Sequence, residues 1–463
     1  MGSEWKTRAL KDCATWYSGG TPRKGNPEYW GGNIPWISAK SLKEFFVSDS
    51  EEKITESGLD NGSRLIPKNS ILFVVRGMSL KKEFRMGITT RPVAFNQDLK
   101  GLVANEDILP YFLAYAIRGK TKEILDLVGE AGHGTGILPT DRIQDIQIPC
   151  LNLKVQQRIV DFLKTLDDKI ELNRRMNATL EGMAQALFQS WFVDFAPVLD
   201  NALAAGNPIP DELADRAAIR RQALDNGTAN REAAQHFPAT FQFTEEMGWI
   251  PEGWEILELE NTVSTIIDHR GKTPKKLKSN WVESGYPAIS AKNIKAGKLV
   301  RKDTIRFTDH ELYERWMPVE LKKGDLLMTS EAPLGEKLYL AKKFKWVLSQ
   351  RLFGLRANEK ISGIYLYHWL NTETAKADLE GRASGTTVQG IRQSELRKVN
   401  VLTPSQECIS VFSRASDSVM EKRATNESNT EMLTKLRDTL LPKLISGELR
   451  IADADKLAEE AMV

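Results

Sequence analysis

The chain repeats itself once, and this duplication constrains its fold more than any other feature of the sequence. Segment 34–43 aligns with segment 286–295, and six of the ten positions are identical. Further matches keep the same order, such as Thr21-Pro22 with Thr273-Pro274 and Asn96-Gln97 with Ser349-Gln350. Ordered matches whose offset drifts only between 249 and 255 indicate a tandem duplication with small loop insertions. We therefore expect one structural unit that is used twice.

The first part of each copy, residues 1–150 and 249–404, has the pattern of a mixed α/β domain. Dense apolar runs at Ile71 to Val75 and Leu326 to Met328 predict buried strands. Glycine-rich turns separate such runs along the chain. Residues 196–248 lie between the copies and are rich in turn residues, so we interpret them as a connector rather than a domain.

The second part of each copy, residues 151–195 and 405–463, predicts a long helix. Apolar side chains recur there with strict three-four spacing, which is typical of a coiled-coil seam. Neither seam can remain in water, so we expect the two helices to pack on each other, antiparallel if an approximate two-fold axis relates the copies. Asn173, Asn177 and Asn426 fall in the seam, where they either set the register or are merely tolerated near a coil end. The seven-residue rows are Leu163, Ile170, Asn177, Ala184 and Trp191 in copy one, and Phe412, Val419, Asn426, Leu433 and Leu440 in copy two.

The sequence offers no catalytic constellation. It contains no phosphate-binding P-loop, no Gly-x-Ser-x-Gly, no Cys-x-x-Cys and no histidine pair with metal-ligand spacing. The three cysteines, Cys13, Cys150 and Cys408, are scattered, which fits a reducing compartment. The first ten residues are polar, and no apolar run approaches the ~20 residues of a membrane helix. We expect a cytoplasmic protein without a metal or cofactor of its own.

Basic residues are segregated, although the net charge of +2 is close to zero. Segment 266–302 holds ten Lys and Arg against two acids, and segment 76–91 holds five against one. Basic loops mixed with Gly, Thr, Ser and Asn suit DNA, because Lys and Arg neutralise phosphates while Arg, Asn and Gln read base edges. For a single lysine a solvated surface is the simpler explanation, but clusters at equivalent places in both copies favour DNA. The candidate DNA-binding residues are Thr21, Arg23, Lys24, Lys40, Lys43, Arg76, Lys81, Lys82, Arg85, Arg270, Lys272, Lys275, Lys276, Lys292, Lys295, Lys342 and Lys343.

Five motifs stand out along the chain. They are the Gly-Gly-Thr-Pro turn (19–22), the Pro-Trp-Ile-Ser-Ala-Lys block (35–40), the Leu-Phe-Gln-Ser-Trp-Phe helix end (187–192), the Ile-Pro-Glu-Gly-Trp segment (250–254) and the Leu-Leu-Pro-Lys-Leu-Ile-Ser-Gly-Glu-Leu tail (440–449). Together they resemble the specificity subunit of type I restriction–modification systems, and the resemblance covers essentially the whole chain. The Gly-Gly-Thr-Pro turn is not kept in copy two, where Arg270-Gly271 precedes Lys272, so we expect a differently shaped loop there.

The resemblance implies two target recognition domains, 1–150 and 249–404, joined by an antiparallel two-helix coiled coil that acts as a ruler. Each domain would read one half of a split, asymmetric site in double-stranded DNA, while the subunit itself has no catalytic activity. It would recruit two modification subunits, which bind S-adenosylmethionine and methylate adenine, and restriction subunits that translocate DNA with ATP and Mg²⁺. Our partner-binding candidates are Phe188, Trp191, Phe192, Phe195, Leu440, Leu441, Leu444 and Ile445; alternatively, these side chains close the coil or pack on a recognition domain.

Two rival functions stay open at this point. One is a DNA-modifying enzyme with an unrecognised motif, against which the missing catalytic motifs argue. The other is a coiled-coil adaptor that binds only proteins, which leaves the matched basic loops of the two copies unexplained.

Overall fold

The computed structural model describes residues 5–131, 134–385 and 388–462. These residues form two compact units, and each unit combines one α/β head with part of the two long helices. Unit 1 holds residues 1–173 and 428–463, and unit 2 holds residues 174–427. The long helices are α5 (Leu153–Phe188) and α13 (Gln406–Ser446), and both run through the two units. The predicted combination of two α/β domains and a long helix pair is confirmed.

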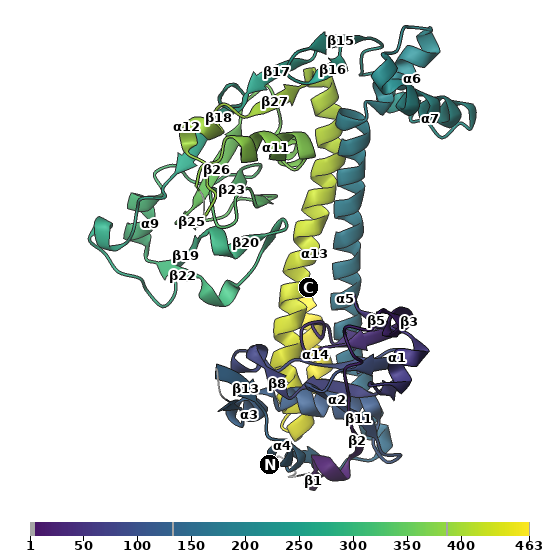
Figure 1. Ribbon diagram of the computed structural model, residues 1–463. Helices are drawn as coiled ribbons and strands as arrows, with labels where there is room; N and C mark the ends of the chain where they lie inside the picture. Colours follow the sequence, from purple (N-terminus) through teal and green to yellow (C-terminus); the bar gives the residue numbers. More distant parts are fainter. Residues whose placement is uncertain (1–4, 132–133, 386–387, 463) are drawn as a thin grey trace. The chain divides into compact units, whose positions relative to one another are not determined.

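The head of unit 1 is built around an antiparallel sheet with the strand order β2-β11-β7-β9, to which β4 adds in parallel. Figure 1 labels β2 and β11 of this sheet. A second sheet, β5-β3-β10-β6, contains the parallel pair β3 and β10. The strands are β1 (Thr7–Ala9), β2 (Ala14–Ser18), β3 (Trp30–Ile37), β4 (Phe46–Val47), β5 (Lys53–Ile54), β6 (Leu65–Ile66), β7 (Ile71–Val74), β8 (Arg76–Gly77), β9 (Met86–Thr89), β10 (Val93–Phe95), β11 (Leu99–Ala104), β12 (Gly129–Ala131), β13 (Thr135–Ile137) and β14 (Gln147–Pro149). The helices are α1 (Glu56–Asp60), α2 (Pro110–Gly119), α3 (Thr121–Asp126), α4 (Thr140–Gln144) and the C-terminal α14 (Ile451–Met462).

The head of unit 2 repeats this plan, with the sheet orders β18-β26-β23-β24 and β22-β19-β25. The strands are β17 (Glu255–Glu258), β18 (Val263–Asp268), β19 (Tyr286–Ile289), β20 (Ile294–Lys295), β21 (Lys298–Leu299), β22 (Arg306–Thr308), β23 (Leu326–Thr329), β24 (Lys337–Tyr339), β25 (Val347–Leu348), β26 (Leu352–Ala357) and β27 (Asn400–Thr403). The helices are α9 (His310–Trp316), α10 (Gly363–Trp369), α11 (Glu373–Gly381) and α12 (Gln393–Leu396).

Strand register shows that the two heads are copies. Tyr17 pairs with Gly101 in unit 1, and Ile267 pairs with Gly354 in unit 2. The parallel pairs also correspond, since Ile37 faces Phe95 and Ile289 faces Leu348. The predicted buried strands are β7 and β23, in which every side chain is buried.

The segment predicted to be a connector is folded, and this corrects the interpretation of residues 196–248. It forms α6 (Ala196–Ala205), α7 (Ala214–Asp225), α8 (Arg231–Ala234) and the hairpin of β15 (Phe241–Thr244) with β16 (Gly248–Pro251). Val198, Leu199 and Phe237 are buried in the same apolar cluster as the head of unit 2. The frequent turn residues therefore mark joints between short elements that share a core, not a free linker.

The two long helices pack against each other in opposite directions, as predicted. In unit 2, Asn177 bonds to Asn426, while Phe188, further along α5, packs on Phe412, earlier in α13. In unit 1, the seam residues Leu166, Ile170 and Leu433 form one buried cluster. The three-four spacing thus correctly identified the faces that the helices bury.

An aspartate of the long helices ties each head to its helix pair, and it is buried in unit 1 and half-buried in unit 2. In unit 1, Asp167 of α5 accepts hydrogen bonds from Tyr115 at 2.9 Å and from Arg437 of α13 at 2.6 Å. In unit 2, the aspartate at the equivalent repeat position, Asp417 of α13, accepts from Tyr339 of β24 at 3.0 Å. A buried charge is tolerated only when it is paired or hydrogen-bonded, so these contacts restrict how each head can sit on the helices of its own unit.

Candidate nucleic-acid interface

The matched motifs of each copy meet beside the parallel strand pair of each head. In unit 1, the backbone N–H of Asn96 donates to the Ile37 carbonyl at 2.9 Å. In unit 2, Ser349 donates to Ile289 in the same way at 2.8 Å. The Ser-Ala-Lys block therefore leaves its strand next to the residue pair Asn96-Gln97 or Ser349-Gln350. The order of the repeat matches along the chain reflects one local structure that is built twice.

The Gly-Gly-Thr-Pro turn of unit 1 lies against the same strand end. Gly20 donates to the Phe95 carbonyl at 2.9 Å, and a Cβ on Gly19 would lie only 2.2 Å from that oxygen, so glycine is required here. The hydroxyl of Thr21 donates to Oε1 of Gln97 at 2.6 Å. In unit 2, a Cβ on Gly271 would meet nothing within 4 Å. The predicted difference between the two loops is confirmed.

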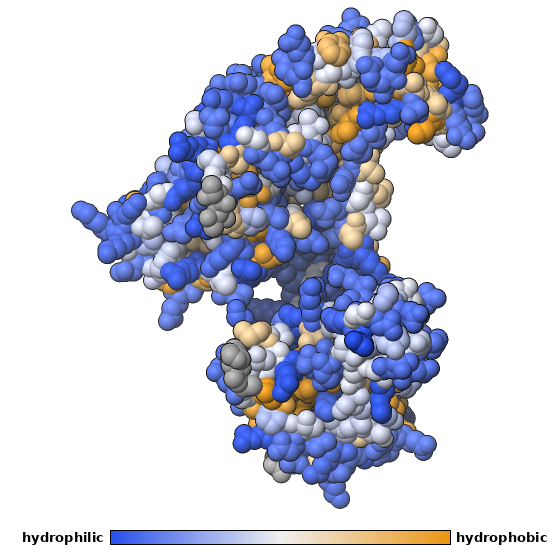
Figure 2. All heavy atoms as spheres, viewed as in Figure 1, coloured by the Kyte–Doolittle hydropathy of each residue, from blue (hydrophilic) through white to orange (hydrophobic). Residues whose placement is uncertain are grey.

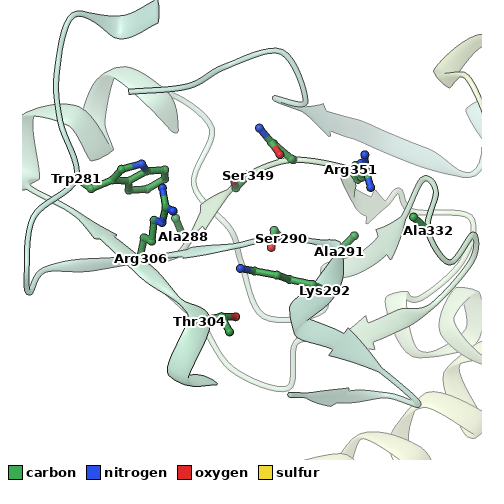
Figure 3. A pocket seen from close by; sticks show the side chains of 11 residues that line it. Trp281, Ala288, Ser290, Ala291, Lys292, Thr304, Arg306, Ala332, Ser349 and Arg351 are labelled. Atoms are coloured by element: carbon green, nitrogen blue, oxygen red, sulfur yellow. The ribbon is translucent and has the colours of Figure 1, made fainter. Parts of the chain in front are cut away.

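A tryptophan fills the space between strand and turn in unit 1 but not in unit 2. The Trp36 side chain is buried, and its indole N–H donates to the Gly20 carbonyl at 3.1 Å. Ala288 takes the equivalent place in β19. Beside it lies a hollow of about 310 Å³, which Lys292 borders on one side and Trp281 with Arg306 at one end (Figure 3). A single difference in side-chain size thus accompanies a hollow in unit 2 and a filled space in unit 1.

Most candidate cations of unit 1 are exposed. Lys24 reaches over the ring of Trp36 at 5.9 Å and pairs with Glu52 at 4.0 Å. Two other candidates also pair with carboxylates, since Lys81 pairs with Glu130 at 2.7 Å and Arg85 with Glu83. Thr21 is partly buried, and the exposed candidates are Arg23, Lys24, Lys40, Lys43, Arg76, Lys81 and Lys82.

Two candidates in unit 2 are structural. Arg270 makes a bidentate pair with Asp268, at 2.8 Å for both bonds, and lies over the Phe353 ring at 4.2 Å. Burial raises the pKa of a carboxyl, but the bonds from Arg270 outweigh it and hold the pKa of Asp268 below its usual value. Lys272 donates to the Trp316 carbonyl at 2.8 Å, and burial lowers its pKa. Charge counting alone could not separate these cations from exposed ones.

The other candidates of unit 2 lie at its surface. Lys276 donates to the Gly271 carbonyl at 2.9 Å, and Lys343 pairs with Glu320 at 2.6 Å. Lys342 lies over the Phe344 ring at 5.4 Å. Lys275, Lys292 and Lys295 are exposed. On the face in view, the surface is mostly hydrophilic over both heads (Figure 2).

Opposite charges occupy equivalent positions in the two heads. The backbone N–H of Val75 donates to the backbone carbonyl of Asp98 at 2.8 Å. In the same way, the backbone N–H of Ser330 donates to the backbone carbonyl of Arg351 at 2.9 Å. Arg76 and Asp98 of unit 1 therefore correspond to Glu331 and Arg351 of unit 2, whose side chains pair at 3.0 Å. The two heads therefore present exchanged charges at this strand end.

The eight partner-binding candidates are buried, which corrects that prediction. Phe188, Trp191, Phe192 and Phe195 belong to the core of unit 2, where Phe192 also packs on Trp254 at 5.8 Å. Leu440, Leu441, Leu444 and Ile445 belong to the core of unit 1, and the last of these approaches Gly119 of α2. The alternative explanation, that these groups pack the coil against a head, agrees with the structure. Apolar periodicity identifies a buried face but not the molecule that buries it.

Sequence reasoning missed several residues that line the hollow of unit 2. Trp281 and Arg306 come from different elements, with the guanidinium 5.5 Å from the indole ring, and Thr304 and Gln350 complete the polar lining. One signal was present in the sequence, because Gln97 and Gln350 are matched in the repeat. Trp281, Thr304 and Arg306 lie outside the matched motifs of the repeat, so no motif marked them.

The described residues hold no group of three or more His, Cys, Asp or Glu side chains placed to bind a metal ion. Among the same residues, no helix is long and apolar enough to cross a membrane.

This chain is similar to known proteins over most of its length. The family model described as "Type I restriction modification DNA specificity domain" matches residues 2–182 and again residues 251–411. The type I restriction enzyme MjaIX specificity subunit of Methanocaldococcus jannaschii is 24% identical, over 97% of this chain and 94% of that protein. The HindI specificity subunit of Haemophilus influenzae is 28% identical, over 74% of this chain and 78% of that protein. The crystal structure of a type I system S subunit from M. genitalium has the same fold, with a TM-score of 0.55 at 14% identity, covering 95% of this chain and 96% of that one.

Proposed function

We infer the function of this chain from its family, because the chain belongs to the type I restriction modification DNA specificity family through both of its copies. It is a DNA specificity subunit with two recognition domains. We assign the reading of DNA to the groove of each head, where the Thr-Pro turn, the Ser-Ala-Lys block and a glutamine meet. The head of unit 1 would read one half-site and the head of unit 2 the other.

The observation that carries this proposal is that one strand-end arrangement occurs twice with different side chains. Gln97 and Gln350 keep the same place, whereas Trp36 is replaced by Ala288 and Asp98 by Arg351. Two identical grooves would favour a palindromic target. Two grooves with different donors and acceptors favour an asymmetric target in two parts. The long helices α5 and α13 would then set the gap between the half-sites.

The exposed cations supply the sequence-independent part of binding. Each Lys or Arg that neutralises a phosphate releases counterions, so affinity falls as salt rises. With a net charge of +2 the chain has little general attraction for DNA. We propose that two modification subunits share the phosphate contacts and supply the chemistry, methylating adenine with S-adenosylmethionine.

We also propose that restriction subunits, which use ATP and Mg²⁺, complete a cytoplasmic assembly. The chain itself would hold no cofactor and carry out no reaction. An assay of the purified chain with S-adenosylmethionine and with Mg²⁺ tests this division of roles. Methyl transfer or DNA cleavage by the chain alone would contradict it.

Exchange of one head tests the assignment of half-sites. Residues 1–150 are replaced by those of a relative, and methylated adenines are mapped by single-molecule sequencing of the host genome. We expect one half-site to change while the other half-site and the gap stay the same. Exchange of residues 249–404 is the matched control and should change the other half-site. A change in both half-sites after either exchange would rule out two independent reading heads.

A further inference from the structure

The hollow in the head of unit 2 corresponds to a space in unit 1 that a side chain fills. In unit 1 the Trp36 indole occupies the space between β3 and the Gly-Gly-Thr-Pro turn, and Trp30 packs against it edge-on at 5.2 Å. In unit 2, Ala288 leaves that space open as a cavity of about 310 Å³. The cavity thus lies beside the strand end to which we assign the reading of DNA.

The lining of this cavity combines an aromatic wall with polar groups. Trp281 forms the wall and is backed by Trp316, whose ring centre is 6.0 Å away, while the Arg306 guanidinium lies beside the indole (Figure 3). Around them, Ser290, Thr304 and Gln350 provide hydroxyl and amide groups. Such a set can stack a flat heteroaromatic ring and hydrogen-bond its edge.

A second, basic hollow adjoins the first. It shares Trp281, Arg306, Ser349 and Gln350 with the cavity and is otherwise lined by Trp316 and by the loop from Lys272 to Asn280. Lys275 and Lys278 of that loop are exposed, and Thr273 and Ser279 add hydroxyl groups. An aromatic cavity beside a cationic one fits the two parts of a nucleotide, the base and its phosphate.

We propose that the cavity beside Trp281 receives a nucleobase turned out of the DNA stack, and that unit 1 has no such receptor because Trp36 fills the space. The inference rests on the proposed function, since it needs DNA in this groove. Proteins that take a base out of a duplex hold it by stacking and by hydrogen bonds to its exposed edge. Arg and aromatic rings both stack well on bases of any identity, while Gln350 and the hydroxyls add selectivity. The two heads then differ in the mode of recognition as well as in the bases that they recognise.

The test uses the complete complex with its modification subunits, bound to its own target DNA. 2-Aminopurine, whose fluorescence rises when it is unstacked, replaces adenines one at a time in the half-site of unit 2. Permanganate oxidation reports unstacked thymines in the same duplexes. The adenine that is methylated is left out, because methyltransferases turn out their own target base. We expect one base in the half-site of unit 2 to become unstacked. In the half-site of unit 1 we expect no base other than the methylated adenine to become unstacked.

Variants separate the cavity from general DNA affinity. Ala288→Trp fills the hollow and should remove the unstacking signal. If the tryptophan prevents folding, Ala288→Leu, which fills only part of the hollow, should still reduce the signal. Trp281→Ala should lower the signal several-fold, whereas Trp281→Phe, which keeps an aromatic wall, should retain it. Lys295→Ala changes an exposed cation outside the cavity, so it should weaken binding and leave the signal at saturation unchanged.

Each result decides one of two claims. Sequence-specific binding of the complex without any unstacked base in the half-site of unit 2 overturns the cavity assignment and leaves the proposed function intact. A signal that persists in both Ala288→Trp and Trp281→Ala overturns it as well. Absence of sequence-specific DNA binding by the folded complex overturns the proposed function and the cavity assignment together.

Discussion

Asn426 of α13 donates a hydrogen bond from Nδ2 to Oδ1 of Asn177 on α5 at 2.9 Å, and both side chains are buried. Asn177 in turn donates to the Arg423 carbonyl at 3.2 Å. This pair lies in the apolar seam within unit 2, where the sequence predicted polar positions. A buried amide pair specifies how two helices align, because any shift leaves polar atoms without partners.

Single replacement of the pair should destabilise the seam more than double replacement. Asn426→Leu leaves the Asn177 carbonyl oxygen without its donor, which costs about 1–3 kcal/mol. The double variant Asn177→Leu with Asn426→Leu removes both polar groups and should recover that loss. Urea unfolding midpoints measure the stability, and light scattering should reveal mixed association states in the double variant. Equal midpoints for all variants would show that the pair has no structural role.

Removal of Arg437 should strongly destabilise unit 1. Arg437→Ala leaves the buried Asp167 carboxylate without its closest cation, and breaking a buried pair costs about 3–5 kcal/mol. Asp438→Ala is the control, because Asp438 bonds to the same arginine from an exposed position, where an ion pair contributes about 1 kcal/mol or less. Replacement of both partners, Arg437→Met with Asp167→Leu, should restore much of the stability. Chemical denaturation measures all three, and a loss for Asp438→Ala as large as that for Arg437→Ala would contradict the prediction.

Acid should weaken unit 2 through His368. Burial lowers the pKa of this side chain from 6.5 to about 4. Between these values the unfolded chain binds a proton that the folded chain does not, so stability is full above pH 6.5 and falls as the pH falls toward 4. The loss is on the order of 3 kcal/mol. Unfolding midpoints between these two pH values should show a smaller slope for His368→Gln, while His310→Gln, at an exposed position, should keep the slope of the unmodified chain.

Two lysines of one loop should respond differently to replacement. Lys275 is exposed, so Lys275→Ala should weaken DNA binding by the complex and reduce the slope of log affinity against log salt by roughly 0.9 if it contacts one phosphate. Lys272 donates to the Trp316 carbonyl, so the main effect of Lys272→Ala should be a lower melting temperature of the protein. Binding titrations at several salt concentrations and thermal melts check both. A normal melting temperature for Lys272→Ala would return that lysine to the DNA-binding set.

Lengthening both long helices by one heptad should lengthen the gap between the half-sites. Seven residues add about 10 Å of helix, which is about three base pairs of DNA. A heptad keeps the seam in phase, whereas four added residues shift it and should destabilise the coil. Mapping of methylated adenines reports the gap, and an unchanged gap with unchanged half-sites would remove the role of ruler.

Much of the architecture was predictable from local pattern and repetition. The rows through Leu163, Ile170 and Asn177 marked the buried helix faces, and the matches around Ser38 and Ser290 marked equivalent strand ends. Prediction failed where the outcome depended on which surface covers an apolar group. Phe188 and Leu444 have the pattern of an interface, and each is covered by the head of its own unit. The interpretation of residues 196–248 as a connector failed for the same reason, because short helices such as α6 gain their stability from a core that no local pattern reveals.

The sequence by itself determined that one unit is used twice, that each copy ends in a helix with an apolar seam, and that cations gather in matched loops. These properties depend on spacing and on order, which are written along the chain. Only the tertiary structure decided which cations are structural, as Arg270 is, and which side chain fills the groove, as Trp36 does and Ala288 does not. Burial, pairing and cavity shape arise from residues far apart in the chain, such as Trp281 with Arg306 and Gln350. Their meeting is a property of the packed heads and not of any one segment.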